Sequence, residues 1–197
     1  SDVAHTYGVR AGALVPYAAD STLFVDPAAL AMVVIGPDGR FARVRSIWRA
    51  EHITSVSNTT GSMGFPGVDG RGRIVYRVTG PPTQVRFSSP SGGFMMFPIQ
   101  ADSGFVVAAD LTTRKVDTLA VIQLPRSQQR PREMGEGRWT FEFVANPLPA
   151  ADQWAVTPDG TIAIVRWRDY RVEYIHPDGS ASESAKLPYE WQRLDDD

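Results

Sequence analysis

The stretch "VTPDGTIAIVRWRDYRVEYIHPDGS", residues 156–180, repeats a turn signal at a short interval. Pro-Asp-Gly occurs at 158–160 and again at 177–179, and each copy predicts a turn, because Asp bonds its own backbone and Gly accepts a positive φ. Residues 161–165 and 171–175 lie between the turns and are rich in β-branched and aromatic types, which favour strands. The stretch therefore predicts an antiparallel meander.

The same pattern occurs further upstream. Turn signals occur at residues 36–39 and 69–72. Strand-like runs occupy residues 23–25, 31–35, 73–77, 105–108 and 116–122. One small meander cannot bury its own faces, whereas stacked copies share a continuous core. We therefore predict an all-β chain built from similar antiparallel sheets that lie against one another.

The phrase "WAVTPDGTIA" at 154–163, followed by "DYRV" at 169–172 and a second Asp-Gly at 178–179, resembles bacterial six-bladed β-propellers of the NHL and TolB-like kind. The resemblance is clearest over 151–190 and extends to 18–48 and 68–122. It implies blade architecture and export to the bacterial periplasm or cell envelope. It says little about activity.

A full ring of six blades at about 40–45 residues each needs a longer chain than this one. We expect about three to four antiparallel blades in one β-propeller-like domain or fragment, that is, a partial or open propeller. The blade-like units are placed at about residues 13–48, 64–122 and 139–188. The alternative fold is a β-sandwich.

Three stretches interrupt the repeated pattern, namely residues 49–67, 80–104 and 123–139. Proline, glycine and β-branched residues recur in them too often for a helix of any length. The third stretch is polar and Arg-rich, and residues 123–134 within it predict a solvated loop.

Composition excludes several classes of function. The 197 residues carry a net charge of −2 and no clustering of basic residues, so we predict no nucleic-acid binding. Cysteine is absent, which removes disulfides, thiolate metal sites and a cysteine nucleophile. No run approaches the roughly 20 apolar residues of a membrane-spanning helix.

Hydrolytic catalysis is poorly supported. A nucleophilic Ser needs a strained turn together with His and a carboxylate, and the motif Gly61-Ser62-Met63-Gly64 lacks that spacing. The histidines are His5, His52 and His176, and the last is interpreted as a strand-end residue beside a turn. We predict no catalytic residues.

A calcium site is the second chemistry considered, because oxygen ligands suit a hard cation. The candidate oxygen donors are Asp26, Asp69, Asp110, Asp152 and Asp169. Aspartates beside Gly or Pro usually make turns, which is our interpretation of Asp38, Asp159 and Asp178. We predict no metal site and no cofactor.

The sequence offers candidate residues for binding other proteins rather than catalytic or metal-binding residues. Phe94, Met95, Met96 and Phe97 are four large apolar side chains in succession, so a strand there is either buried on both faces or presents a patch that a partner covers. Two further candidate sets for partner binding are Arg126, Arg130 and Arg132, which could dock on an acidic partner, and Trp167, Arg168 and Tyr170, whose alternative role is packing within a blade hairpin.

We therefore predict a non-catalytic β-propeller module that binds or scaffolds other proteins. The sharper form of this hypothesis is an extrinsic subunit that stabilises a larger envelope or membrane complex, such as a photosynthetic reaction-centre and antenna complex, and contacts the membrane only through its partner. The alternative is a ligand-binding propeller or a calcium-dependent, lactonase-like hydrolase. A cytoplasmic location also stays open.

Overall fold

The computed structural model describes residues 12–57, 64–88, 92–125, 128–135, 138–144 and 150–188. Strands dominate these residues, and the helical segments among them are the 3₁₀ turn η2 (Ala50–His52) and the single-turn helix α1 (Ile53–Val56). The predicted all-β class is confirmed. The short helices correct the expectation that residues 49–67 hold no helix.

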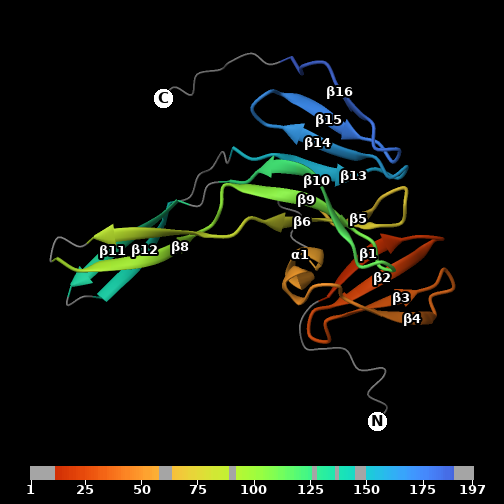
Figure 1. Ribbon diagram of the computed structural model, residues 1–197, viewed down its shortest axis with the longest axis horizontal. Coiled ribbons are helices and arrows are strands. Elements are labelled where there is room, and N and C mark those ends of the chain that lie inside the picture. Colours follow the sequence, from red (N-terminus) through yellow and green to blue (C-terminus); the bar gives the residue numbers. More distant parts are fainter. Residues whose placement is uncertain are drawn as a thin grey trace, which may run out of the picture.

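The described chain contains three four-stranded antiparallel sheets, which we call the first, middle and last sheet (Figure 1). The first sheet holds β1 (Ala13–Tyr17), β2 (Ser21–Asp26), β3 (Ala31–Ile35) and β4 (Phe41–Ser46). The middle sheet holds β5 (Gly67–Val68), β6 (Ile74–Thr79), β9 (Ser103–Ala109) and β10 (Val116–Gln123). The last sheet holds β13 (Gln153–Val156), β14 (Ile162–Arg166), β15 (Arg171–Ile175) and β16 (Ala181–Glu183). In each sheet the spatial order of strands follows the chain, as in a propeller blade.

Two hairpins are inserted into this series. The hairpin of β7 (Thr83–Ser88) and β8 (Phe94–Ile99) leaves the middle sheet between β6 and β9, and the hairpin of β11 (Gln128–Gly135) and β12 (Arg138–Val144) lies between the middle and last sheets. Both project to the same side of the molecule (Figure 1). We call these four strands the arm.

Strand β11 corrects the prediction of a solvated loop over 123–134. Its composition is unfavourable for a strand, yet it pairs with β12 along its length, from Gln128 opposite Val144 to Gly135 opposite Arg138. Strand formation here depends on the partner strand rather than on local preference. Pro131 is tolerated because a two-stranded ribbon leaves one edge of each strand without a ladder.

The predicted Asp-Gly turns are confirmed. The carboxylate of Asp159 accepts bonds from Thr161 and from the Thr157 hydroxyl, and these bonds, led by the one from Thr157, lower the pKa of Asp159. Asp178 accepts from Ser180 in the same way. Gly160 adopts φ +82°, the left-handed conformation that such a turn requires.

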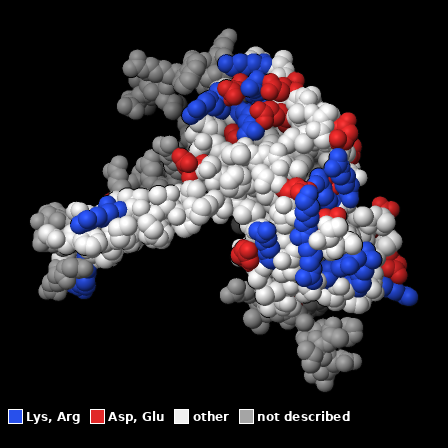
Figure 2. All heavy atoms as spheres, in the orientation of Figure 1, with Lys and Arg blue, Asp and Glu red and all other residues white. Residues whose placement is uncertain are grey.

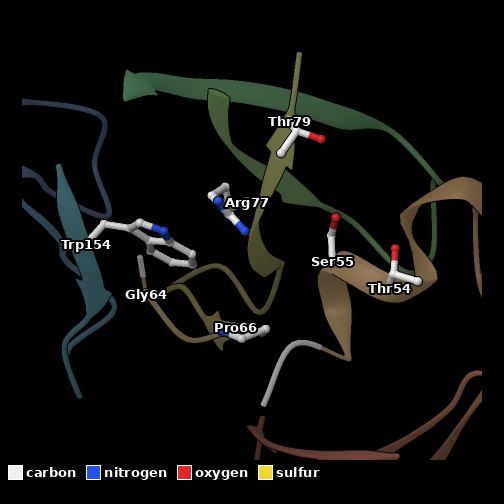
Figure 3. Close-up of a pocket in the computed structure, with 7 residues that line it drawn as sticks. All are labelled: Thr54, Ser55, Gly64, Pro66, Arg77, Thr79 and Trp154. Atoms are coloured by element: carbon white, nitrogen blue, oxygen red, sulfur yellow. The ribbon is translucent and has the colours of Figure 1, made fainter. Parts of the chain in front are cut away.

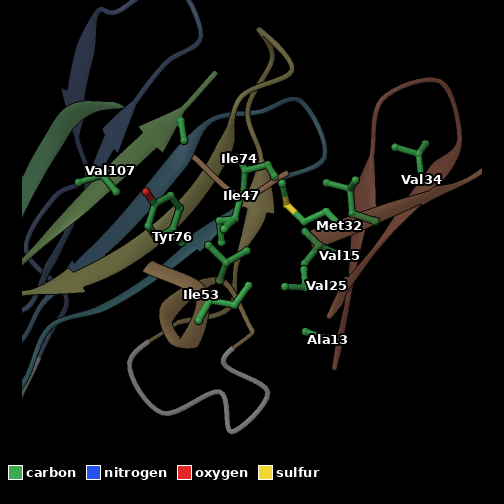
Figure 4. Close-up of a cluster of buried hydrophobic side chains, with 13 residues drawn as sticks. Ala13, Val15, Val25, Met32, Val34, Ile47, Ile53, Ile74, Tyr76 and Val107 are labelled. Carbon is green, nitrogen blue, oxygen red and sulfur yellow. The ribbon is translucent and has the colours of Figure 1, made fainter. Parts of the chain in front are cut away.

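Two separate cores join the three sheets. The core between the first and middle sheets is shown in Figure 4 and includes Leu23, Val25, Met32, Ile74 and Tyr76, all fully buried. The core between the middle and last sheets includes Val75, Val106, Ala108, Trp154 and Ile164. Neighbouring residues of β6 point into opposite cores, since side chains alternate along a strand. The middle sheet is therefore buried on both faces, and the sheets pack in series instead of forming a two-sheet sandwich.

A hydrogen-bonded trio closes the first core. The Trp48 indole N–H donates to the Tyr76 hydroxyl at 2.9 Å, and that hydroxyl lies 2.7 Å from Nδ1 of His52. Burial raises the pKa of Tyr76 to about 12 and lowers the pKa of His52. Because Trp48 is a donor, the Tyr76 proton is left to donate to a neutral His52.

Arg166 ties the last sheet to the middle sheet. Its guanidinium donates to Asp152 at 2.8 Å, to Glu173 at 2.6 Å and to the carbonyl of Val121 in β10 at 2.7 Å. Burial lowers the pKa of Arg166, but the two carboxylates more than offset this and the pKa is raised. Arg166 therefore stays charged within a fully paired network.

Candidate interaction surface

The register of β7 and β8 separates two faces of the arm. Val85 pairs with Phe97 and Phe87 pairs with Met95 on one face, where all four side chains are half-buried. Arg86 pairs with Met96 and Ser88 with Phe94 on the other face, which is more exposed. We call these the inner and outer faces of the β7–β8 hairpin.

The inner face packs against the second hairpin. The ring of Phe97 lies 4.3 Å from that of Phe141 in β12, edge to face, and 5.7 Å from Phe87. Such aromatic pairs hold the two hairpins together with a favourable geometry. None of the described arm residues belongs to either core of the three sheets. The arm is therefore a thin apolar layer of its own.

The outer face presents large apolar side chains to solvent. Phe94 is 59% exposed and Met96 is 48% exposed, and the Arg86 guanidinium carbon stands 4.1 Å above the Phe94 ring. Figure 2 shows few charged side chains along the arm compared with the sheets. Exposed aromatic, Met and Arg side chains are the composition that protein interfaces favour.

The predicted contact residues divide between two places. Phe94, Met95, Met96 and Phe97 lie on β8 with alternating exposure, so this strand is not buried on both faces. Arg132 is exposed on β11 of the same arm, Arg130 is placed there by its backbone alone, and Arg126 lies outside the described residues.

Trp167, Arg168 and Tyr170 lie on the reversal between β14 and β15, in the last sheet and not on the arm. Arg168 stands 5.5 Å from the Trp167 ring. Tyr170 has a positive φ of 50° and donates its N–H to Arg166 at 3.0 Å, which forms the tight turn of this hairpin. Their geometry fits the role in a blade hairpin that was the alternative for these residues.

Sequence reasoning missed three residues of the arm. Arg86 lies on the outer face, and Trp139 and Phe141 are half-buried on β12. The alternation of apolar residues in "RWTFEF" at 138–143 predicts the strand. Nothing in the sequence shows that it faces β8.

The aspartates considered as calcium ligands instead form turn hydrogen bonds or ion pairs with arginine. Asp26 accepts bonds from Ala28 and Ala29, and Asp110 from Thr112 and Thr113, as turn-forming residues do. Asp69 pairs with Arg73 at 2.8 Å, Asp152 pairs with Arg166 at 2.8 Å, and Asp169 lies 3.7 Å from Arg171. Within the described residues, no three His, Asp or Glu side chains gather in a way that could hold a metal ion.

The two described histidines lie beside different sheets and have different partners. His52 belongs to the Tyr76 trio, and His176 lies 2.8 Å from the Ser182 hydroxyl at the surface of the last sheet. His5 lies outside the described residues. Over the part of the chain that the structure covers, no helix has the length and apolarity needed to cross a membrane.

Comparisons with known proteins give no family. No protein-family model and no curated protein matches the chain. Among solved structures, a catalytically inactive virginiamycin B lyase from Staphylococcus aureus with quinupristin aligns at a TM-score of 0.31 with 13% identity, covering 94% of this chain and 58% of that chain. A selenomethionine form of virginiamycin B lyase from Staphylococcus aureus gives 0.30 with 10% identity over 90% and 70% of the two chains, and a streptogramin B lyase gives 0.25 with 11% over 90% and 68%.

The chain thus spans 58% of the length of the first of these structures. At such TM-scores the alignments establish no shared family, activity or ligand. The NHL and TolB-like resemblance of the sequence accordingly stays a prediction.

Proposed function

We propose that this chain is a protein-binding β module whose arm docks on another protein, as an extrinsic subunit of a larger assembly at the cell envelope. The observation that carries the proposal is the outer face of the arm, where Phe94 and Met96 are exposed beside Arg86. Burying these side chains against a partner would remove apolar surface from water, which is the dominant favourable contribution to most protein–protein association.

The charges on the arm define the partner's chemistry. The described exposed cations include Arg86 on the outer face and Arg132 on β11, with Glu142 as an exposed acid on β12. The matching surface is an apolar pocket of a protein with Asp or Glu side chains at its rim. The envelope location, and membrane contact only through the partner, are supported by the resemblance of the sequence to exported propellers.

The test compares two double variants of the full chain. Phe94→Ser with Met96→Ser removes the apolar side chains of the outer face. Phe41→Ser with Val44→Ser is the matched control, because these β4 residues are 51% and 53% exposed but lie in the first sheet. Each protein would be used to capture partners from envelope membranes, and the captured protein would be identified and purified for calorimetry.

We expect the wild type and the β4 control to bind the purified partner alike, and the arm variant to bind at least about tenfold more weakly, which is about 1.4 kcal/mol. Arg86→Glu should weaken binding relative to the wild type, because the new carboxylate would face the acidic rim of the partner. The loss should be larger at low salt, where this repulsion is less screened. Equal binding by the arm variant and the control would disprove docking through this face.

The calcium-dependent alternative predicts that removing a bound metal destabilises the protein, whereas the protein-binding proposal does not. A resident cation stabilises the folded state by binding it preferentially, so its removal lowers the Tm. The aspartates described above already pair with arginine or cap turns. We expect the Tm to be the same with and without a chelator, and a clear fall in Tm would favour the calcium-dependent form.

A further inference from the structure

The first and last sheets each have one face that points away from the middle sheet. Where two sheets pack, their faces are tightly covered. Trp154 of β13 is 4% exposed and stands against Gly64, where any side chain would clash with the indole (Figure 3). Side chains alternate along a strand, so the neighbours of such core residues lie on the opposite side of their sheet. We call these opposite sides the far faces of the first and last sheets.

The far face of the first sheet is apolar across all four strands. The register places the residues between the core positions in one row, which consists of Leu14, Phe24, Val33 and Val44. Leu14 is 68% exposed and Val44 is 53% exposed. The next row, which ends at Ile35 and Phe41, is free of charged residues as well.

The far face of the last sheet has the same character. One row holds Gln153, Val165 and Val172, and the next row begins with Ala155 and Ala163. Val165 is 41% exposed, and neither row contains a charged residue. The small side chains of this face can interdigitate with the larger ones of the first sheet.

The lack of charge on both far faces points to a second layer. An antiparallel sheet with one face in water normally carries polar side chains on that face. Charged residues make up 21% of this chain, yet the four rows described above contain none. Depletion of charge is typical of the buried centre of an interface.

The three sheets are arranged around one cavity. Strand β5 contacts both β1 and β13, so the first strands of the three sheets lie together. The ends of these strands line a cavity of about 590 Å³, with Tyr17 from β1, Val68 from β5 and Val156 from β13. A series of sheets that shares an axis in this way can close into a ring when the same kind of contact is repeated.

We propose that a second copy of this chain covers both far faces. The far face of the first sheet in each copy packs on the far face of the last sheet in the other copy, and the two chains form a closed dimer. This contact continues the order in which the sheets already pack within one chain. It removes both faces from water, which is the dominant favourable contribution to most protein–protein association. The proposal does not depend on the function of the arm.

Two charged variants of the full chain test which faces meet. Leu14→Glu places a carboxylate on the far face of the first sheet, and Val165→Lys places an ammonium group on the far face of the last sheet. Each charge would be buried without a partner in a dimer of identical variants, so each dimer should dissociate at least about tenfold more readily than the wild type in sedimentation equilibrium. An equimolar mixture of the two variants should restore the dimer, because one pair of faces is then unaltered and the other pair brings the carboxylate to the ammonium group.

Substitutions elsewhere separate this contact from folding and from the arm. Met96→Glu adds a charge at an exposed side chain of the arm and should leave the dimer intact, whereas Phe41→Ser with Val44→Ser should dissociate it while each chain still binds through the arm. If circular dichroism shows that a charged variant is unfolded, Leu14→Ser and Val165→Ser take the place of the charged pair. The proposal is wrong if the wild type is monomeric or forms assemblies larger than a dimer. It is also wrong if only one of the two charged variants dissociates, which would indicate contact between identical faces, or if their mixture stays monomeric.

Discussion

At the scale of single residues, the hydroxyl of Tyr76 serves as both acceptor and donor between two elements. It accepts from Trp48 and faces His52, residues that lie 28 and 24 positions away in the sequence. Local pattern could predict the turn aspartates, because each bonds the backbone within two or three residues of itself. It could not predict this trio, since its members meet only after the first and middle sheets pack.

Tyr76→Phe removes one hydroxyl and leaves the Trp48 N–H and His52 without their partner. We expect the free energy of unfolding to fall by about 1–3 kcal/mol, the usual cost of an unsatisfied buried polar group. Urea denaturation would measure it. Tyr174→Phe, at a half-buried tyrosine of the last sheet, is the control and should change stability by less than about 0.5 kcal/mol. A neutral result at Tyr76 would mean that the trio does not stabilise the fold.

His52 should make stability depend on pH. Burial lowers its pKa below the ordinary 6.5, so the unfolded chain takes up the proton at a higher pH than the folded chain does. The stabilisation is complete above about pH 6.5 and is lost as the pH falls through the lowered pKa of the folded state.

The measurement compares wild type with His52→Gln by urea denaturation at several pH values from neutral to mildly acidic. The wild type should lose more stability than His52→Gln on acidification. Parallel curves for wild type and His52→Gln would show that His52 does not titrate in this window.

At the scale of elements, the arm is an insertion that the sheets tolerate. The β7–β8 hairpin leaves from Thr79 and returns at Ser103, and these ends are already adjacent because Thr79 pairs with Gly104. The sequence predicts an apolar β8 at Phe94–Phe97. Its exposure could not be predicted, since four apolar residues in a row fit a buried strand equally well. Strand β11 was missed because its partner β12, not its composition, makes it a strand.

Replacing residues 83–99 by a short Gly-Ser turn should leave the three sheets folded. The arm contributes no described residue to either core, so we expect the Tm in thermal circular dichroism to stay within about 4 °C of wild type, which is about 1 kcal/mol for a chain of this size. Removal of β2 (Ser21–Asp26), whose Leu23 and Val25 are fully buried in the first core, should by contrast broaden or abolish the transition. A large fall in Tm, or loss of the unfolding transition, in the protein that lacks the hairpin would show that the arm stabilises the sheets.

At the scale of the whole molecule, the repeated turns in the sequence predicted the antiparallel sheets. They did not predict that the middle sheet packs between the first and the last. Pro-Asp-Gly punctuation marks the first and last sheets, where strands follow one another without interruption. In the middle sheet the same four strands are separated by the inserted hairpin, so only a weak copy is visible in the sequence. The two-sided burial of β6 follows from its neighbours and has no local signal beyond an apolar run.

The two cores should respond independently. Leu23→Ala acts in the first core and Ile164→Ala in the second, and both residues are fully buried. Each should cost about 2–5 kcal/mol. Because the sites lie on opposite faces of the middle sheet, the double variant should lose the sum to within about 0.5 kcal/mol, as measured in urea. A large departure from the sum would mean that the middle sheet transmits strain between its faces.

The reach of the arm has an electrostatic consequence. Phe94 begins β8 at the end far from the sheets, and a strand of this length extends about 20 Å at roughly 3.3 Å for each residue. At physiological ionic strength the screening length is about 8 Å. A partner held at the tip would therefore be shielded from the many charges on the sheets, and the rate at which it is captured would respond to salt only through the few ionic groups of the arm itself.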